Sequence, residues 1–134
     1  MTGQVELRVR YAETDQMGRA HHGHYIVWCE MGRTALMREH GISYTELEKQ
    51  GVMLPVTRVE IDYRAPLSYD DAVHVDTRIS SVRSRSVTFE YEVYRAADEL
   101  LVARAATTLT CMDGDGKTRR MPDDVLDALR AIAA

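Results

Sequence analysis

Residues 24–39, HYIVWCEMGRTALMRE, carry the pattern that decides the fold. Apolar side chains recur through this stretch at the three- and four-residue spacing of an α-helix. Further apolar residues fill most of the other positions, so the polar strip of Glu30, Arg33 and Thr34 is narrow. A helix that is apolar on most sides is usually wrapped by other structure. The pattern therefore predicts one long helix over this stretch, with little of its surface facing water.

Alternation of apolar and polar residues surrounds this helix on both sides. Residues 5–11 alternate before it, and four further alternating runs follow it, at residues 59–65, 73–79, 87–93 and 101–109. A period of two predicts half-buried strands. The short connections at residues 80–85 and 96–99 indicate antiparallel hairpins. We therefore expect an antiparallel sheet with one face to bury and one long helix to cover it.

Shorter segments complete the expected elements. Gly41 suits a C-terminal cap of the long helix. Ser43, followed three residues later by Glu46, predicts a short capped helix. The sequence DGDG at residues 113–116 predicts a turn. Pro122 to Ala133 is typical of a terminal helix, because proline is tolerated near a helix start.

These elements together predict the α+β class. The expected arrangement is a curved antiparallel sheet of about five strands wrapped around one long central helix, which is called a hotdog fold. The length of 134 residues predicts a single domain spanning residues 1–134. One helix can cover only part of the apolar surface of such a sheet, so we expect a homodimer or a homotetramer built as a dimer of dimers.

Composition argues against several classes of protein. Acidic residues outnumber basic ones by 21 to 17, which disfavours general nucleic-acid binding. The first ten residues, MTGQVELRVR, lack the apolar run of a signal peptide, and no apolar run approaches the roughly 20 residues that span a bilayer. Cys29 and Cys111 lie far apart in apolar stretches, as buried thiols do. We expect a cytoplasmic protein with no membrane span.

The loop before the long helix carries the candidate chemistry. Asp15 lies in it, seven residues before His22. A helix N-terminus presents unpaired N–H groups and a partial positive charge, which can stabilise an oxyanion. A loop of this length can set the carboxylate opposite that helix end. A thioester carbonyl between them would then meet a nucleophile or general base on one side and N–H donors on the other. Gly18 and Gly23 would let the backbone approach a substrate closely.

The segment at residues 9–34 resembles the signature of the 4-hydroxybenzoyl-CoA thioesterase family of hotdog proteins. That signature has a strand, then Thr-Asp, two residues, Gly, and a short loop that ends in Tyr at the helix start. The matching residues here are Thr14, Asp15, Gly18 and Tyr25, and the helix continues in family style with Trp28, Glu30 and Arg33. Downstream, Tyr63-Arg64-Ala65-Pro66-Leu67 followed by Asp70-Asp71 resembles the second motif of the family. The likeness covers roughly residues 5–112.

The resemblance implies an acyl-CoA thioesterase that needs no metal or redox cofactor. It gives Asp15 the role of attacking the thioester or of activating water. A backbone N–H near His22 would bind the carbonyl oxygen, and Gly23 and Tyr25 would contact the substrate. Many acyl-CoA members have an aromatic residue and an Asn where this chain has His21 and His24, so the acyl preference stays open.

Coenzyme A carries phosphates, which need cations. Arg83 and Arg85 lie in the hairpin after the third predicted strand, and a second basic group contains Lys117, Arg119 and Arg120. Either group could hold phosphate through charge-assisted hydrogen bonds. Each of these residues could equally be an exposed solubilising charge.

Other interpretations remain open at this level. Asp15 could only cap its loop. The three histidines near the helix start lack the matching ligand spacing of a metal site. Glu30 and Arg33 could pair with each other. As a whole, the chain could be a hotdog hydratase or dehydratase, or a non-catalytic acyl-CoA-binding protein.

Overall fold

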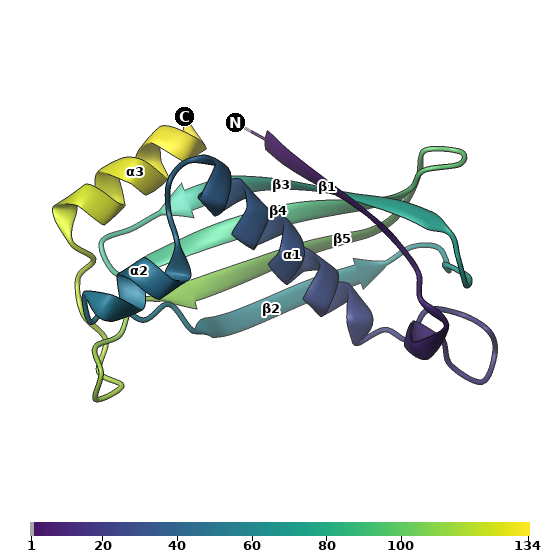
Figure 1. The fold of residues 1–134 in the computed structure, drawn as a ribbon, viewed down its shortest axis with the longest axis horizontal. Helices are drawn as coiled ribbons and strands as arrows, with labels where there is room; N and C mark the ends of the chain where they lie inside the picture. Colours follow the sequence, from purple (N-terminus) through teal and green to yellow (C-terminus); the bar gives the residue numbers. More distant parts are fainter. Residues whose placement is uncertain (1) are drawn as a thin grey trace.

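The computed structural model describes residues 2–134, which form one five-stranded antiparallel sheet in the order β1-β3-β4-β5-β2 (Figure 1). The strands are Thr2–Arg8 (β1), Val56–Tyr63 (β2), Ala72–Val82 (β3), Ser86–Arg95 (β4) and Leu100–Thr110 (β5). The helices are His24–Glu39 (α1), Tyr44–Lys49 (α2) and Asp123–Ala133 (α3), with a short 3-10 turn at Tyr11–Glu13 (η1). Because α1 lies across one face of the sheet, the hotdog prediction is confirmed.

The core lies between α1 and the inner face of the sheet. Buried and less buried residues alternate along β3 and β4, as expected for strands with one covered face. Gly32 lets α1 approach the sheet closely, because a Cβ there would lie 2.4 Å from the Oγ1 atom of Thr77. The largest core side chains of α1 and the central strand β4 are Trp28, Leu36, Met37, Phe89 and Tyr91.

Two local predictions were wrong in detail. The first strand ends at Arg8 and not near residue 11, because the Glu13 side chain accepts the backbone N–H of Arg10 and turns the chain into η1. Ser43 precedes α2 but makes no side-chain cap, and Glu46 instead accepts a hydrogen bond from Lys49 at 3.2 Å. The predicted C-terminal cap at Gly41 is confirmed by its φ of +79°.

Several apolar side chains are more exposed than the sequence suggests. On α1, Val27 and Met31 are 47% and 45% exposed. On β2, Val56, Val59 and Tyr63 are 41%, 40% and 47% exposed. Since β2 is an edge strand of the sheet, these side chains leave an apolar margin along it.

The two ends of the sheet carry different loops (Figure 1). The loop that holds Asp15 lies at the end where β1 finishes and β3 begins, since Val9 exchanges backbone hydrogen bonds with residues 70–71. The hairpin at residues 83–85 lies at the opposite end of β3, where Ser84 accepts a backbone hydrogen bond from Met121 at 2.8 Å. The ten residue steps of β3 between these loops correspond to about 33 Å.

None of the helices in residues 2–134 combines the length and the hydropathy needed to cross a membrane.

Candidate active site

Asp15 lies at the tip of a small hairpin that precedes α1. The hairpin is closed by backbone pairing of Glu13 with His21 and of Thr14 with Ala20. Asp15 itself pairs through its backbone N–H with the carbonyl of Arg19 at 2.7 Å. Its carboxylate atom Oδ1 accepts the N–H groups of Met17 and Arg19, at 2.9 and 3.2 Å. These contacts fix the orientation of a half-buried carboxylate, and Oδ2 has no protein partner in the described chain.

The contacts of Asp15 recur at Asp113 in a different loop. The Oδ1 atom of Asp113 accepts the N–H groups two and four residues ahead, at 2.9 and 3.0 Å, as that of Asp15 does. Both turns also place a glycine with positive φ three residues after the aspartate, at +76° for Gly18 and +80° for Gly116. The capping interpretation of Asp15 is therefore realised, and any catalytic role depends on what lies beside the turn.

The start of α1 lies directly after this hairpin. Its N-cap residue, Gly23, has no side chain to cap the helix, and its own N–H donates to the Nδ1 atom of His21. The His22 N–H has no hydrogen-bond acceptor within residues 2–134. The hydroxyl of Tyr63 donates to the His22 carbonyl at 2.7 Å and holds this turn against β2. An oriented N–H at a helix start is the group that an oxyanion requires.

Glu13 is a site-forming residue that the sequence analysis missed. It is only 3% exposed. Its Oε2 accepts the indole N–H of Trp28 at 3.0 Å, and its Oε1 accepts the Arg10 N–H at 2.8 Å. Burial by itself would raise the pKa of Glu13, but these hydrogen bonds and the nearby Arg10 guanidinium outweigh it, so the pKa lies below its usual value. Glu13 is therefore an ionised carboxylate that ties the base of the Asp15 hairpin to α1.

Aromatic rings extend this tie to β2. The Tyr25 ring lies 4.7 Å from that of Trp28 and 5.0 Å from that of Tyr63, measured between ring centroids. Tyr25 is 3% exposed, so its side chain supports the helix start from inside. Tyr63 belongs to the second motif noted in the sequence, so a role near the site could be expected for it. Nothing in the local sequence marks Glu13 as buried.

The three histidines cluster at the surface of the same turn. The rings of His21 and His22 lie 4.1 Å apart, and that of His24 lies 5.9 Å from His21. The Nδ1 atom of His21 accepts the Gly23 N–H at 3.1 Å, so it is occupied by the backbone. Among the described residues, no group of His, Cys, Asp and Glu side chains has the geometry of a metal site.

Cys29 is the only thiol on α1. Burial raises its pKa to about 12, so it is protonated at neutral pH and unsuited to attack a carbonyl. Of the two carboxylates in the hairpin, Glu13 and Asp15, only Asp15 combines partial exposure with an oxygen that has no partner in residues 2–134.

The predicted phosphate-binding arginines lie far from this site. Arg83 and Arg85 are exposed in the hairpin at the opposite end of β3, about 33 Å from the Asp15 end by strand length. The second basic group lies beside them, since the Cys111 N–H donates to the Arg85 carbonyl and the Arg119 N–H to the Cys111 carbonyl. The two basic groups thus form one basic end of the molecule, separate from Asp15 within a single chain.

Glu30 and Arg33 do not pair with each other in the described chain, which corrects that interpretation. Glu30 is exposed, whereas Arg33 turns inward and is 7% exposed. The polar strip predicted for α1 therefore includes a buried cation.

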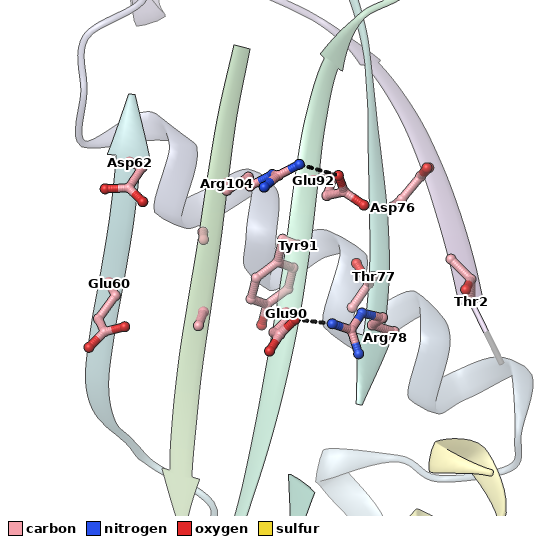
Figure 2. A pocket seen from close by; sticks show the side chains of 12 residues that line it. Thr2, Glu60, Asp62, Asp76, Thr77, Arg78, Glu90, Tyr91, Glu92 and Arg104 are labelled. Carbon is pink, nitrogen blue, oxygen red and sulfur yellow. Dashed lines mark hydrogen bonds and ion pairs between the residues drawn. The ribbon is translucent and has the colours of Figure 1, made fainter. Parts of the chain in front are cut away.

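A surface groove lies on the other side of the sheet. Figure 2 shows it on the face of the strands away from α1, with ion pairs between Arg78 and Glu90 and between Arg104 and Glu92. Its volume is about 600 Å³, but it does not reach the hairpin of Asp15. This groove is therefore no part of the candidate active site.

Comparison with known proteins decides the family. The family model described as "Thioesterase-like superfamily" matches residues 9–129. The chain belongs to the thioesterase-like superfamily. This confirms the thioesterase expectation at the family level and leaves the 4-hydroxybenzoyl substrate untested.

Individual relatives agree with this thioesterase-like assignment. The Bacillus subtilis protein YneP is 42% identical over 108 residues, which cover 81% of this chain and 78% of YneP. The acyl-CoA thioester hydrolase YbgC of Escherichia coli O157:H7 is 31% identical, with 90% of each chain covered.

Solved structures of similar proteins have the same fold. A hypothetical protein of Thermus thermophilus, TT1821, superimposes with a TM-score of 0.92 at 34% identity, covering 100% of this chain and 99% of that one. A DHNA-CoA thioesterase from Staphylococcus aureus superimposes with a TM-score of 0.92 at 30% identity, covering 98% and 90%.

Proposed function

We propose that this protein hydrolyses an acyl-CoA thioester to the free acid and coenzyme A. The observation that carries the proposal is the His22 N–H at the start of α1, directly after a hairpin whose Asp15 carboxylate keeps one oxygen free; neither group has a partner within residues 2–134. Relatives named as acyl-CoA thioester hydrolases support the same reaction. Residues 1–134 would act as one hotdog unit, and the two free, buried cysteines suit a reducing cytoplasm.

Asp15 supplies the attacking oxygen or the base in this proposal. As a nucleophile, its free Oδ2 adds to the thioester carbonyl and expels the coenzyme A thiolate, leaving an anhydride that water hydrolyses. As a general base, it takes a proton from water while that water adds to the carbonyl. In both routes the carbonyl oxygen becomes an oxyanion, which the His22 N–H and the helix start stabilise. Gly23 and Tyr25 shape the turn that presents this N–H.

A homodimer formed along β2 would complete the site. The exposed apolar margin of Val56, Val59 and Tyr63 lies on an edge strand with free backbone groups. A two-fold axis beside β2 sets the strands of the two copies antiparallel, so the basic end of one copy lies near the Asp15 end of the other. Arg83 and Arg85 of the second copy could then hold the phosphates that the same chain cannot reach. Back-to-back pairing of two such dimers would give the tetramer.

The test of the proposed function is hydrolysis of a panel of acyl-CoA esters by the purified protein. The panel spans short, medium and long acyl chains and includes 4-hydroxybenzoyl-CoA and DHNA-CoA, and release of the thiol is followed with a thiol reagent. We expect hydrolysis of at least one thioester well above the rate in buffer. Binding of these esters without turnover would instead establish a non-catalytic acyl-CoA-binding protein, and formation of an enoyl product would establish a hydratase or dehydratase.

A further inference from the structure

Arg33 is a buried cation whose only hydrogen-bond partners among residues 2–134 are hydroxyl groups. Its Nε donates to the hydroxyl of Tyr44 at 3.1 Å, and its Nη1 donates to that of Tyr91 at 3.3 Å. Tyr91 in turn shares a 2.6 Å hydrogen bond with Thr107. These four side chains form the Arg33 cluster, which joins α1 and the chain after it to β4 and β5.

No carboxylate forms an ion pair with Arg33 in the described chain. None of the ion pairs among residues 2–134 includes it. Burial raises the pKa of Tyr44 and of Tyr91, so both hydroxyls are neutral. A guanidinium stays protonated and has five N–H donors, of which the two tyrosines take two. Burying an unbalanced charge is costly, so its presence points to an anion that arrives from outside the chain.

A second buried polar atom beside the cluster also lacks a partner. The Oγ1 atom of Thr77 is buried and makes no hydrogen bond within the described chain. Thr77 lies opposite Tyr91 in the pairing of β3 with β4, and both extend toward α1, which runs behind the strands in Figure 2. The hydroxyl packs against the backbone of Gly32, so it is a second polar atom that the core under α1 leaves without a partner in the described chain.

The Arg33 cluster adjoins the part of the inner sheet face that α1 leaves open. Thr107 pairs with Val59, which is 40% exposed on β2, and Tyr63 lies four residues further along this strand. Tyr63 holds the His22 carbonyl, so β2 runs from the helix start to the cluster over about 13 Å. Along α1, the eight residue steps from Tyr25 to Arg33 give about 12 Å. An acyl group whose thioester lies at the helix start can extend along this path to Arg33.

We propose that the Arg33 cluster is a subsite for a carboxylate at the far end of the acyl group, so that the preferred substrates are mono-CoA thioesters of dicarboxylic acids. This inference rests on the proposed function, which places the thioester at the start of α1. The carboxylate takes the free N–H groups of the guanidinium and balances its charge, while the methylene chain lies along the apolar side chains of β2. A fatty acyl chain of the same length would leave the cation unbalanced.

The test compares pairs of thioesters that differ only in the terminal group: adipoyl with hexanoyl, suberyl with octanoyl, and sebacoyl with decanoyl. We expect kcat/KM of the wild type to be at least about tenfold higher for the carboxylate member of the best pair, as for a charge-assisted hydrogen bond. Arg33→Met should abolish this ratio while hydrolysis of the uncharged member continues. Arg38→Met, on an exposed arginine of the same helix, is the control and should keep the ratio.

Binding of the free acids separates this inference from the proposed function. Calorimetry of suberate and octanoate needs no turnover. We expect the wild type to bind suberate more tightly than octanoate, and the Arg33→Met protein to bind suberate no more tightly than octanoate. Hydrolysis of both members of every pair with equal kcat/KM by the wild type would overturn the inference and leave the proposed function standing. A preference for hydroxyaryl thioesters over all the dicarboxylic ones would also overturn it. If Arg33→Met does not fold, Arg33→Lys, which keeps the charge, should retain part of the preference.

Discussion

Glu13 shows how a single residue can prepare a site without touching the substrate. It lies two residues before Asp15, and its buried carboxylate receives N–H groups from Trp28 and Arg10. A glutamine has only one acceptor oxygen, so Glu13→Gln would turn an N–H toward one of these donors. We expect the free energy of unfolding to fall by about 1–3 kcal/mol, measured by urea denaturation.

The kinetic effect of the same change separates positioning from stability. Because Glu13 anchors the hairpin of Asp15, kcat should fall in Glu13→Gln while KM changes little. Trp28→Phe, which removes one donor and leaves the carboxylate, is the matched control and should lower kcat less. Wild-type kcat and stability in Glu13→Gln would show that the contact has no role.

His74 makes stability depend on pH at the outer face of the sheet. Its Nε2 lies 2.8 Å from Glu99 and its Nδ1 3.3 Å from Asp76. Burial by itself would lower the pKa of His74, but hydrogen bonds and charge from these two carboxylates outweigh it, so the pKa is raised above 6.5. A raised folded-state pKa gives stabilisation that is complete below the unfolded pKa and is lost as pH rises through the folded pKa.

The difference in Tm between the wild type and His74→Gln measures this stabilisation. It should be largest near about pH 5.5 and shrink toward about pH 8.5, where the imidazole is neutral in both states. Glu99→Gln should flatten the dependence. A difference in Tm that does not vary with pH would refute the role of His74.

At the scale of elements, the spacing of α1 over β3 depends on Gly32. A methyl group there would meet the Thr77 hydroxyl at 2.4 Å, and neither backbone can retreat without disturbing the core. We expect Gly32→Ala to lower the free energy of unfolding by about 1–3 kcal/mol in denaturant titrations. The double variant with Thr77→Ala should recover most of the loss, because it removes the clashing atom. If Gly32→Ala and the double variant lost the same free energy of unfolding, the clash would not involve the Thr77 hydroxyl.

The long helix was predictable because its evidence is local. The expected and observed ends of α1 agree at His24 and Glu39, since the periodicity lies within the segment itself. The end of β1 was not predictable, because it depends on the buried carboxylate of Glu13, whose partner Trp28 lies 15 residues away in sequence. The inward orientation of the Arg33 side chain was not predictable either, because its partners lie outside the helix, on β4 and in the chain after α1. Its three-residue spacing from Glu30 had suggested a surface ion pair instead.

The site was predictable in part for the same reason. The turn of Asp15 and the helix start are neighbours in sequence, and the structure places them together. The position of the basic residues was not predictable, because Arg83 and Arg85 carry the charge that phosphate needs but lie at the end of β3 far from Asp15. Sequence gives the charge of a side chain and not the end of the sheet on which it falls.

At the scale of the whole molecule, the apolar margin of β2 predicts self-association. Val59→Lys places a charge in the middle of this margin and should convert a dimer into a monomer in sedimentation equilibrium. Val27→Lys, at a similarly exposed apolar site on α1 next to β1, is the control and should leave the dimer intact. A monomeric wild type, or a Val59→Lys protein that still dimerises, would remove β2 as the interface.

The measurement that tests the central claim most directly is the kcat of Asp15→Asn beside that of Asp113→Asn. The two aspartates make the same pair of side-chain hydrogen bonds to their own turns, and asparagine retains the accepting Oδ1. If the Asp15 carboxylate attacks the thioester or activates water, kcat should fall by about 100-fold or more in Asp15→Asn and remain at the wild-type value in Asp113→Asn. Equal activity of both variants would mean that Asp15, like Asp113, only closes its turn.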